Sequence, residues 1–521
     1  MAFDLEIQLI TAPRVWAREQ AAVKAISVLG TASNVGKSWT VAALGAWLRR
    51  QGVKVAPFKA QNMSNNSFVT LEGGEIGRAQ GAQAAACGLR AIAEMNPILL
   101  KPAGNSTSQL VLLGQAKEHI AAREYYRHIE TLWETVAATL EFWRSRTDVL
   151  LLEGAGSPVE LNLMHRDLVN LRPIIHLQGR WLLVADIEKG GVFAQAVGTA
   201  SLMPPDARSL GLGLVVNKFR GDLSLFSTAS QHFQDHLPEL PYLGTLPYRN
   251  DLQPESEDSL CREAEEGGSG AAIAWIRFPF VSNSQDSQPW QLDQGVRTVW
   301  VKSVAELKAA KPRAVILPGT KNTLADLRWL WESGLGAEIQ QLAAQGLPVV
   351  GICGGYQMLG DRIVDLTGGG GEVGDAQGLG LLPMMTLFEA VKSVTQVQAM
   401  VPDGKRVEQW QGYEIHMGQT RFRANSIFTA DQNVPLVSVT QGNGDRRGEG
   451  VQLNNIWGTY LHGLFESGTM REKLAIRAKI PGYQRGRIPW QTQQQQLYGA
   501  MADLLESHLD LNPIRRYLDL S

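Results

Sequence analysis

The sequence predicts an α/β protein made of two successive domains, the first built around a parallel β-sheet. Short runs rich in Val, Leu and Ile alternate with helical segments up to about residue 250. A glycine-rich turn that carries a lysine lies between the first predicted strand and the first helix. A polar break at 254–270 then precedes a second set of alternating strands and helices. Together these observations favour two α/β domains in one chain.

Length and composition exclude several classes of protein. The chain has 521 residues, too many for one ordinary core, with 44% apolar residues, 19% charged residues and a formal net charge of -2. The balanced charge and the lack of a basic stretch argue against a nucleic-acid binder, and no apolar run is long enough to predict a membrane span. The isolated cysteines, without CxxC spacing, indicate a reducing cytoplasm rather than a disulfide scaffold or a zinc site.

The first predicted domain covers residues 21–253, after an N-terminal arm at 1–20. Its strands are continuous apolar runs at 25–30, 53–59, 148–154, 181–187 and 212–218. Such runs between helices are typical of a parallel sheet that is buried on both faces. Residues 119–147 are expected to form one long helix.

The second predicted domain covers residues 271–482, after a linker at 254–270 that is acidic and then rich in Gly and Ser. A helix is expected near 323–344, and strands are expected at 271–279, 296–302, 314–319 and 347–353. Residues 483–521 are interpreted as a C-terminal tail with a glutamine-rich run and a short final helix.

The turn after the first strand has the features of a phosphate-binding loop. Five residues separate Gly30 from Gly36, where the usual pattern has four, and Lys37 and Ser38 follow. Glycines let backbone N–H groups approach an anion, and the helix N-terminus adds its dipole. Gly30, Thr31, Gly36, Lys37 and Ser38 are therefore predicted to bind nucleotide phosphates. The alternative is a glycine-rich turn with a solvated lysine.

Carboxylates at neighbouring strand ends suggest a magnesium site beside this loop. Glu153 follows a predicted strand, where open sheets bind ligands, and is the best candidate to share Mg²⁺ with Ser38. Asp186 ends the next strand and is a weaker candidate. Asn217 and Lys218 follow another strand and are candidates for contact with the nucleotide base.

The second predicted domain contains a cysteine in a sharp turn. Cys353 follows the strand at 347–353 within LPVVGICGGYQMLG, a frame that exposes a nucleophile at a helix N-terminus. Of the histidines, His462 at a strand end is preferred as its base over His416. The backbone N–H groups of Gly319 and Gly354 are the predicted oxyanion donors.

The two sites together resemble known enzyme families. The second half is similar to class I glutamine amidotransferases, and the first half resembles dethiobiotin synthetase-like ATPases, in which the longer loop spacing is normal. Both halves in one chain match the cobyrinate amidases over about residues 22–480. The segments that carry this resemblance most closely are 57–70, 74–84, 95–102, 186–194 and 217–222.

The resemblance implies an ATP- and Mg²⁺-dependent amidation with glutamine as the nitrogen donor. ATP would phosphorylate the b, d, e and g carboxylates of adenosylcobyrinic acid a,c-diamide, and ammonia would displace phosphate to give adenosylcobyric acid. Cys353 would attack the glutamine amide, and His462 would pass a proton to the departing ammonia. Many class I amidotransferases carry a Glu two residues after the His, but this chain has Leu464 there and Glu466 as the nearest acid. A Cys–His dyad is therefore expected.

The corrinoid surface is predicted from amide side chains that follow the second strand. Amides suit the recognition of amides and carboxylates, and simple turn chemistry is the alternative. The Glu75 carboxylate is expected to join the metal or substrate shell. The residues of this predicted surface are Gln61, Asn62, Asn65, Asn66 and Glu75.

Two other functions compete with this interpretation. Cobyrinic acid a,c-diamide synthase has the same parts and acts on an earlier corrinoid, but the AQNMSNN segment favours the later enzyme. A partition- or maturation-type ATPase shares the longer loop, but it has no use for a domain with a glycine-flanked cysteine.

Overall fold

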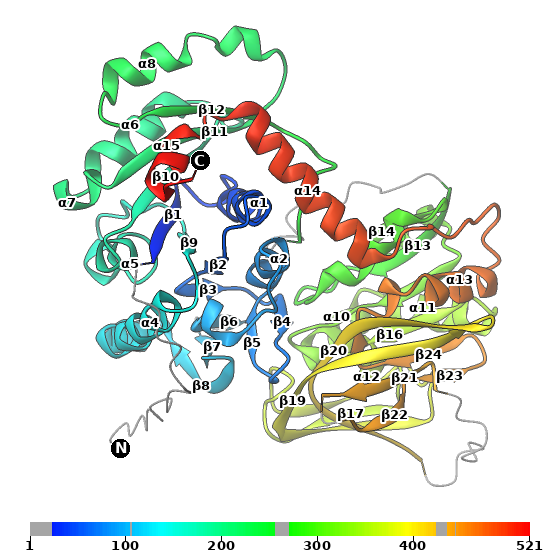
Figure 1. Cartoon of the computed structure of the whole chain (residues 1–521). Helices are drawn as coiled ribbons and strands as arrows, with labels where there is room; N and C mark the ends of the chain where they lie inside the picture. Colours follow the sequence, from blue (N-terminus) through cyan, green and yellow to red (C-terminus); the bar gives the residue numbers. More distant parts are fainter. Residues whose placement is uncertain (1–22, 105–106, 256–269, 424–434, 443, 521) are drawn as a thin grey trace.

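A computed structural model describes residues 23–104, 107–255, 270–423, 435–442 and 444–520, and Figure 1 shows its two domains side by side. The predicted N-terminal arm and most of the predicted linker lie outside these residues. Within the described ranges, no helix combines the length and apolar character that a membrane crossing requires.

The first domain is built on a six-stranded sheet whose neighbouring strands are all parallel. In spatial order its strands are β12 (Tyr242–Pro247), β11 (Gly211–Phe219), β10 (Arg180–Asp186), β1 (Lys24–Gly30), β9 (Val149–Glu153) and β2 (Val55–Phe58). The helices of this domain are α1 (Lys37–Arg50), α2 (Arg78–Ala86), α3 (Ala122–Tyr125), α4 (Ile129–Arg144), α5 (Leu171–His176), α6 (Val192–Leu202), α7 (Pro205–Arg208) and α8 (Ala229–His236).

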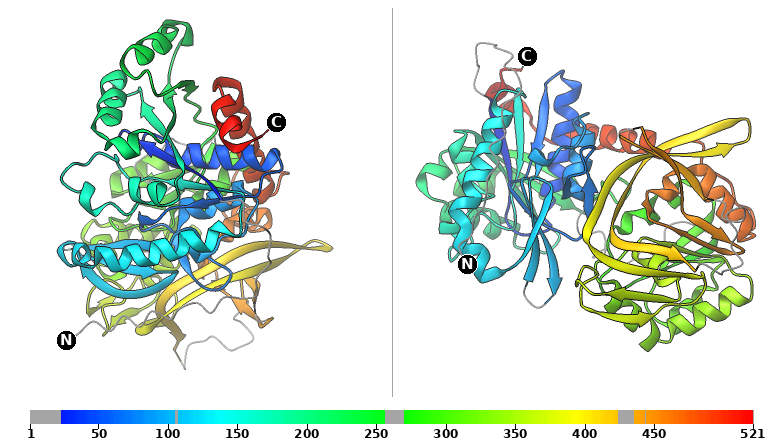
Figure 2. Two further views of the ribbon diagram at one scale, coloured as in Figure 1. Left: turned by 60° about the vertical axis from the view of Figure 1, so that its left-hand side comes forward. Right: turned by 90° about the horizontal axis from the view of Figure 1, so that it is seen from below.

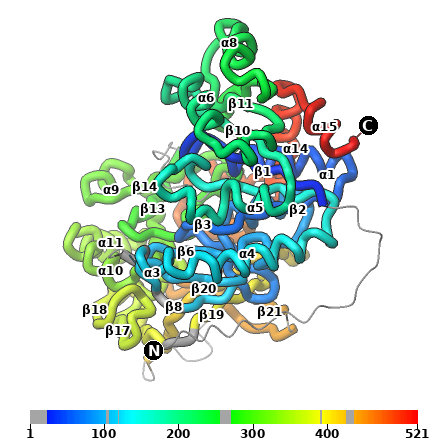
Figure 3. The backbone as a smooth tube through the Cα atoms, turned by 90° about the vertical axis from the view of Figure 1, so that its left-hand side faces the viewer, coloured from blue at the N-terminus to red at the C-terminus, as the bar shows by residue number. Residues whose placement is uncertain are grey.

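Both faces of this sheet are buried, as the continuous apolar strands predict. Along β9, Val149 and Leu151 pack with α1 and α2, whereas Leu150 and Leu152 pack with α4 on the other face. Figure 3 shows α4 and α5 over that second face. Alternate residues point to opposite faces of a strand, so an all-apolar strand is stable only between two helical layers.

The prediction of one long helix at 119–147 is wrong at its N-terminal end. Residues 115–121 form β8, an edge strand of a small four-stranded sheet, and the long helix α4 begins at Ile129. The antiparallel pairing of β8 with β7 decides the conformation of this segment. The short strands of this region are β3 (Gln61–Met63), β4 (Ser67–Val69), β5 (Glu75–Gly77), β6 (Ile98–Gly104), β7 (Thr107–Leu112) and β8 (Gln115–Ala121).

The second domain has a central sheet in which only the edge strand β23 is antiparallel to its neighbour. In spatial order its strands are β14 (Gly295–Val301), β13 (Gly270–Ile276), β15 (Ala314–Leu317), β16 (Val349–Ile352), β24 (Ile456–Thr459) and β23 (Val451–Leu453). Its helices are α9 (Val304–Ala310), α10 (Thr323–Glu332), α11 (Leu335–Ala344), α12 (Gly354–Met358) and α13 (Gly468–Arg477). The helix expected near 323–344 is divided into α10 and α11 because Gly334 adopts a left-handed conformation, φ 76°.

A second, mainly antiparallel sheet of this domain contacts the first domain. Its long hairpin, β19 and β20, curves along the boundary between the domains in Figure 2. Val69 of β4 packs there against Tyr413 and Ile415 of β20. The strands of this sheet are β17 (Arg362–Asp365), β18 (Gly374–Gln377), β19 (Met384–Asp403), β20 (Arg406–Phe422), β21 (Val437–Gln441), β22 (Arg446–Glu449) and β25 (Leu461–His462).

From Trp490 onward, the predicted C-terminal tail is instead part of the first domain. The helix α14 (Trp490–His508) contains the glutamine-rich run and extends back along α1, and α15 (Asn512–Leu518) follows it (Figure 1). Met501 and Leu505 of α14 are fully buried in the same core as Trp47 of α1. The glutamines occupy largely exposed positions of a helix whose other face is apolar. The composition of the run therefore does not indicate that the helix packs against a core.

Replacing Leu505 by Ala should therefore destabilise the first domain. Leu505 is 0% exposed, and a buried Leu→Ala change costs about 2–5 kcal/mol because it leaves a cavity. Urea unfolding followed by tryptophan fluorescence measures this change. The exposed Gln496→Ala change on the same helix is the control and should stay within about 0.5 kcal/mol. Equal unfolding midpoints for the two variants would contradict the structural role of α14.

Candidate active sites

The predicted phosphate-binding loop joins β1 to α1. Gly36 at the helix N-terminus has φ 106°, and a Cβ atom there would lie 2.0 Å from Asn217 Nδ2, so only glycine fits. The Lys37 Nζ atom donates to the carbonyl oxygens of Ala32, at 2.9 Å, and Gly156, at 3.0 Å. Lys37 thus folds over the loop where the phosphates of a nucleotide would bind.

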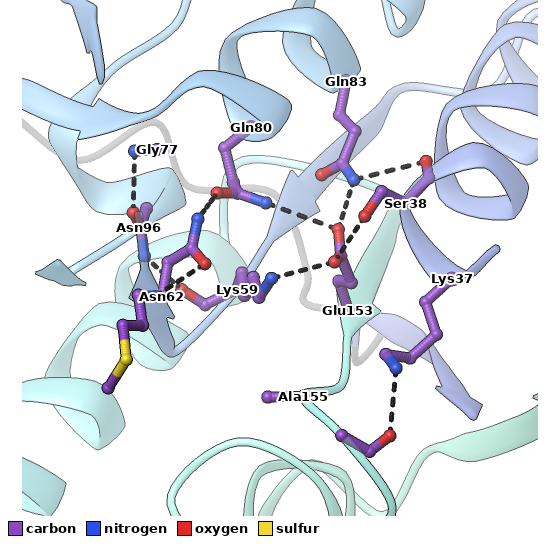
Figure 4. Close-up of polar contacts among 12 residues, drawn as sticks. Lys37, Ser38, Lys59, Asn62, Gly77, Gln80, Gln83, Asn96, Glu153 and Ala155 are labelled. Atoms are coloured by element: carbon purple, nitrogen blue, oxygen red, sulfur yellow. Dashed lines mark hydrogen bonds and ion pairs between the residues drawn. The ribbon is translucent and has the colours of Figure 1, made fainter. Parts of the chain in front are cut away.

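Glu153 is at the centre of a buried polar cluster beside the loop (Figure 4). Its Oε1 atom accepts from Ser38 Oγ at 2.8 Å and from Lys59 Nζ at 2.9 Å, while Gln83 and Gln80 donate to Oε2. Burial alone would raise the pKa of Glu153, but the charge of Lys59 and the hydrogen bonds lower it. The carboxylate is therefore held ionised beside Ser38.

This pair of oxygens fits a magnesium ion. Ser38 supplies a hydroxyl and Glu153 an ionised carboxylate, and both are the hard oxygen ligands that Mg²⁺ prefers. Sequence reasoning missed Lys59, Gln80 and Gln83, because nothing in their local pattern indicates that three separate segments meet at Glu153.

The other predicted nucleotide-binding residues make contacts in or beside the loop. Asn217 Nδ2 donates to the carbonyl of Val35 at 2.8 Å, so this amide braces the loop. Lys218 forms an ion pair with Asp186 at 3.0 Å, and the Thr31 hydroxyl donates to Gln195 Oε1 at 3.3 Å. Neither Asp186 nor Lys218 joins the Glu153 cluster, because β10 and β11 lie on the other side of β1 from β9.

Cys353 lies in a strained turn between β16 and α12. Its φ of 52° and ψ of -110° are unfavourable for a residue with a Cβ atom. The thiol lies at the N-terminus of α12 and donates to the Ile415 carbonyl at 3.3 Å. The structure thus has a sharp turn at Cys353, as the flanking glycines predict.

His462 lies beside Cys353 and is held by a carboxylate. Its Nδ1 atom is 2.7 Å from Asp286 Oδ2, and Asp286 Oδ1 accepts from the Gly463 N–H at 2.8 Å. Since a carboxylate can only accept, Nδ1 carries a proton, and Nε2 lies 3.4 Å from Asn283 Nδ2 on the side of the ring that is left for the thiol. Burial alone would lower the pKa of His462, but Asp286 and Cys353 together raise it to about 10. This environment favours the imidazolium form of His462.

The expected dyad is thus corrected, because Asp286 supplies a third member. It comes from the 3₁₀ segment Ser284–Leu292, which is 176 positions away from His462 in the chain. Leu464 is fully buried in the core, and Asp286 provides the carboxylate that other class I enzymes place two residues after the His. A lone Asp far along the chain carries no local signal, so only the tertiary structure could identify it.

Replacing Asp286 by Asn should lower glutamine cleavage by about 10²–10⁴-fold, as expected when a catalytic imidazole loses its orientation and charge partner. Burial would then dominate and lower the pKa of His462, so the alkaline limb of the kcat/KM profile should move to lower pH. Steady-state glutaminase assays across pH measure both effects. An unchanged profile would contradict the role of Asp286. Amidation with added ammonia is the control and should be retained.

The predicted oxyanion glycines lie in two loops that meet at Cys353. A Cβ atom on Gly354 would lie 2.5 Å from Thr320, and one on Gly319 would lie 2.9 Å from Cε1 of His462. The competing base, His416, stacks on Tyr460 with ring centroids 3.8 Å apart. His416 also lines the cavity that contains Cys353.

The predicted corrinoid residues separate into two groups. On the nucleotide side, Gln61 accepts from the Tyr125 hydroxyl, and Asn62 Nδ2 donates to Gln80 at 2.8 Å, next to the Glu153 cluster. Asn65, Asn66 and Glu75 lie instead at the boundary between the domains.

The boundary group does not join the proposed metal site. Asn66 Oδ1 accepts from the backbone N–H of Asn283 in the second domain at 2.8 Å. Glu75 binds Lys101 of its own domain and Lys392 of the other. Glu75 was expected in the metal or substrate shell. Because these two lysines pair with its carboxylate, it does not join Ser38 and Glu153, and its place in the substrate shell stays a prediction.

Two connected cavities lead to Cys353 along this boundary. The larger, about 510 Å³, is lined by both domains and includes Glu75, Lys321 and Lys392. The smaller, about 60 Å³, contains Cys353 and shares Lys321 and Lys392 with the larger one. A small polar substrate could therefore reach the thiol from the space between the domains.

Comparison with known families agrees with both halves of the chain. The family model of the CobQ/CobB/MinD/ParA nucleotide binding domain matches residues 26–260, and that of the CobB/CobQ-like glutamine amidotransferase domain matches residues 272–470. A crystal structure of a glutamine amidotransferase aligns with a TM-score of 0.30 and 16% identity, over 40% of this chain and 99% of that chain.

The fold and the two sites define a glutamine amidotransferase joined to a nucleotide-binding domain. The chain is 40% identical to cobyric acid synthase of Synechocystis sp. over 95% of this chain and 99% of the relative. It is 41% identical to that of Dehalococcoides mccartyi over 95% of this chain and 98% of the relative. The chain therefore belongs to the cobyric acid synthase family.

Proposed function

We propose that the protein amidates the b, d, e and g carboxylates of adenosylcobyrinic acid a,c-diamide, with ATP and glutamine as co-substrates. The observation that carries this proposal is one chain with a phosphate loop beside Glu153 and a Cys353–His462–Asp286 site in the other domain. Relatives that match nearly the whole chain are named cobyric acid synthase, which favours this corrinoid over the earlier one.

The first domain would activate the carboxylate. A carboxylate is a poor electrophile, and transfer of a γ-phosphoryl group creates a leaving group. Lys37 would neutralise phosphate charge from within the loop, where a low dielectric strengthens the interaction. Ser38 and Glu153 would hold Mg²⁺, which supplies further neutralisation of the phosphate oxygens when bound. Asn217 would keep the loop in its binding shape.

The second domain would release ammonia from glutamine. Cys353 would attack the amide carbon, and the His462 imidazolium would give its Nε2 proton to the leaving nitrogen. The N–H groups of Gly319 and Gly354 would stabilise the oxyanion. Asp286 would hold the imidazole and stabilise its positive charge. Water would then hydrolyse the thioester.

Mass spectrometry of the corrinoid product tests this function. The purified protein should add four amides to adenosylcobyrinic acid a,c-diamide, each needing ATP and glutamine, and should leave cobyrinic acid without its a and c amides unchanged. Amidation of cobyrinic acid at a and c would favour the diamide synthase alternative. Consumption of ATP with no amide gained on either corrinoid would overturn the proposal.

A further inference from the structure

The lysines beside Cys353 leave a positive charge that the mechanism above does not use. Lys101 and Lys392 share one carboxylate, that of Glu75. Lys321 lines both cavities, and its Nζ atom donates to the neutral amide of Gln109 at 3.2 Å. Among the described residues, no carboxylate lies within 4 Å of Lys321 Nζ. A partly buried cation without a paired carboxylate is costly unless a ligand supplies the negative charge.

The environment of Lys321 supports this interpretation. Burial and the positive charges of Lys101 and Lys392 lower the pKa of Lys321 and the charge of Glu75 raises it, so that the pKa lies at about 7. An anion at this position would relieve both effects. Lys321 comes two residues after Gly319, whose α-carbon lies against the ring of His462. Lys321 thus lines the same small cavity as Cys353.

An unpaired acceptor belongs to a residue of the first domain that lines the same pocket. Asn65 lines the small cavity together with Cys353 and Lys321. Its Oδ1 atom is buried and has no hydrogen-bond partner in the part of the chain that the structure describes. A buried amide oxygen left without a donor costs about 1–3 kcal/mol, so a ligand with a donor would stabilise it.

We propose that these two side chains recognise the amino-acid end of the amide substrate, with Lys321 binding its α-carboxylate and Asn65 Oδ1 its α-ammonium. This inference rests on the proposed function, in which Cys353 cleaves glutamine. A glutamine with its amide at Cys353 has its charged end about 5 Å further along the chain of carbons. The lining of the pocket includes a cation and an acceptor, which match the two charges of that end.

The site is then complete only when both domains are in contact. Lys321 belongs to the second domain and Asn65 to the first, and Gln109 of the first domain also holds the Lys321 ammonium. Binding of glutamine would therefore depend on the same boundary that Asn66, Asn283, Glu75 and Lys392 hold together. Asn65 would act on glutamine rather than on the corrinoid for which it was predicted.

Two analogues of glutamine separate the two contacts. Glutaminamide lacks the carboxylate charge, and 4-carbamoylbutanoate lacks the α-ammonium. The wild-type protein should cleave each analogue with a kcat/KM about 30- to 100-fold below that of glutamine, as the loss of one charged hydrogen bond predicts. Lys321→Met should cleave glutamine and glutaminamide with similar kcat/KM but still prefer glutamine to 4-carbamoylbutanoate. Asn65→Ala should cleave glutamine and 4-carbamoylbutanoate with similar kcat/KM but still prefer glutamine to glutaminamide.

Conservative variants and a neighbour serve as controls. Lys321→Arg and Asn65→Asp keep a cation and an acceptor, so each should retain its preference. Lys117 is exposed in the larger cavity, and Lys117→Met should behave like the wild type. Glutamine binding to each variant in a Cys353→Ala background, measured by calorimetry, gives a readout independent of turnover. There, Lys321→Met should weaken glutamine binding and leave glutaminamide binding unchanged.

An unchanged preference in both Lys321→Met and Asn65→Ala would overturn the proposal. Loss of both preferences in each single variant would also overturn it, because it would show a general distortion of the pocket. The ratios are measured on glutamine cleavage alone, so an error in the corrinoid assignment would leave them unaffected.

Discussion

Replacing Lys37 by Ala should abolish amidation with either glutamine or free ammonia as the nitrogen donor. Both reactions need the activated carboxylate, and Lys37 is the buried cation that folds over the phosphate loop. Removing such a preorganised charge at a transferring phosphoryl group costs at least about 10²–10³-fold in rate. Product amides counted by mass, with each nitrogen donor in turn, measure the effect.

The exposed Lys54 of the same domain provides the matched control for Lys37. Lys54→Ala removes the same charge outside the loop and should amidate at the wild-type rate. Lys37→Ala should also lose ATP binding in a fluorescence titration while its glutaminase domain remains folded. Amidation with ammonia at the wild-type rate in Lys37→Ala would show that the phosphate loop is not the activating site.

Replacing Cys353 by Ala should remove glutamine-dependent amidation by on the order of 10⁴-fold or more and preserve ammonia-dependent amidation. The thiol is the only nucleophile that the strained turn presents beside His462 in the described structure. Ammonia added at high concentration and alkaline pH bypasses this domain, since the acyl phosphate is made in the other one. Parallel assays with glutamine and with ammonium salts measure the separation.

Cys87 is a suitable control for this thiol. It is buried in the core under α1, and burial raises its pKa to about 12, so it is inert. Cys87→Ala should therefore keep glutaminase activity. If Cys353→Ala instead cleaves glutamine normally, the assignment of the nucleophile is wrong. If it loses activity with both donors, the two domains do not divide the reaction as proposed.

Local patterns in the sequence predicted the elements that hold the reactive groups. The loop from Gly30 to Ser38 and the glycine frame around Cys353 each need a strand, a sharp turn and a helix within a few residues. Both turns have this form in the structure because glycine and short-range sterics determine them. The resemblance to cobyrinate amidases is likewise confirmed by relatives over nearly the whole chain.

Contacts between distant segments could not be predicted in this way. Asp286 meets His462 across 176 positions, and Lys59 meets Glu153 across 94. Glu75 was expected in the metal or substrate shell, and its carboxylate pairs with lysines of both domains. The residues that flank an Asp or Glu in the chain do not indicate which distant side chain it will pair with. Only the packing of the sheets identifies that partner.

The sequence by itself determined the two α/β domains, the phosphate loop and the cysteine turn, because strand and helix periodicity and glycine conformations act over short distances. Only the tertiary structure decided that α14 completes the first domain, that Asp286 holds His462 and that Asn65 and Lys321 share one pocket. These outcomes depend on burial and on charge pairing between segments that folding brings together, and neither can be read from neighbours in the chain.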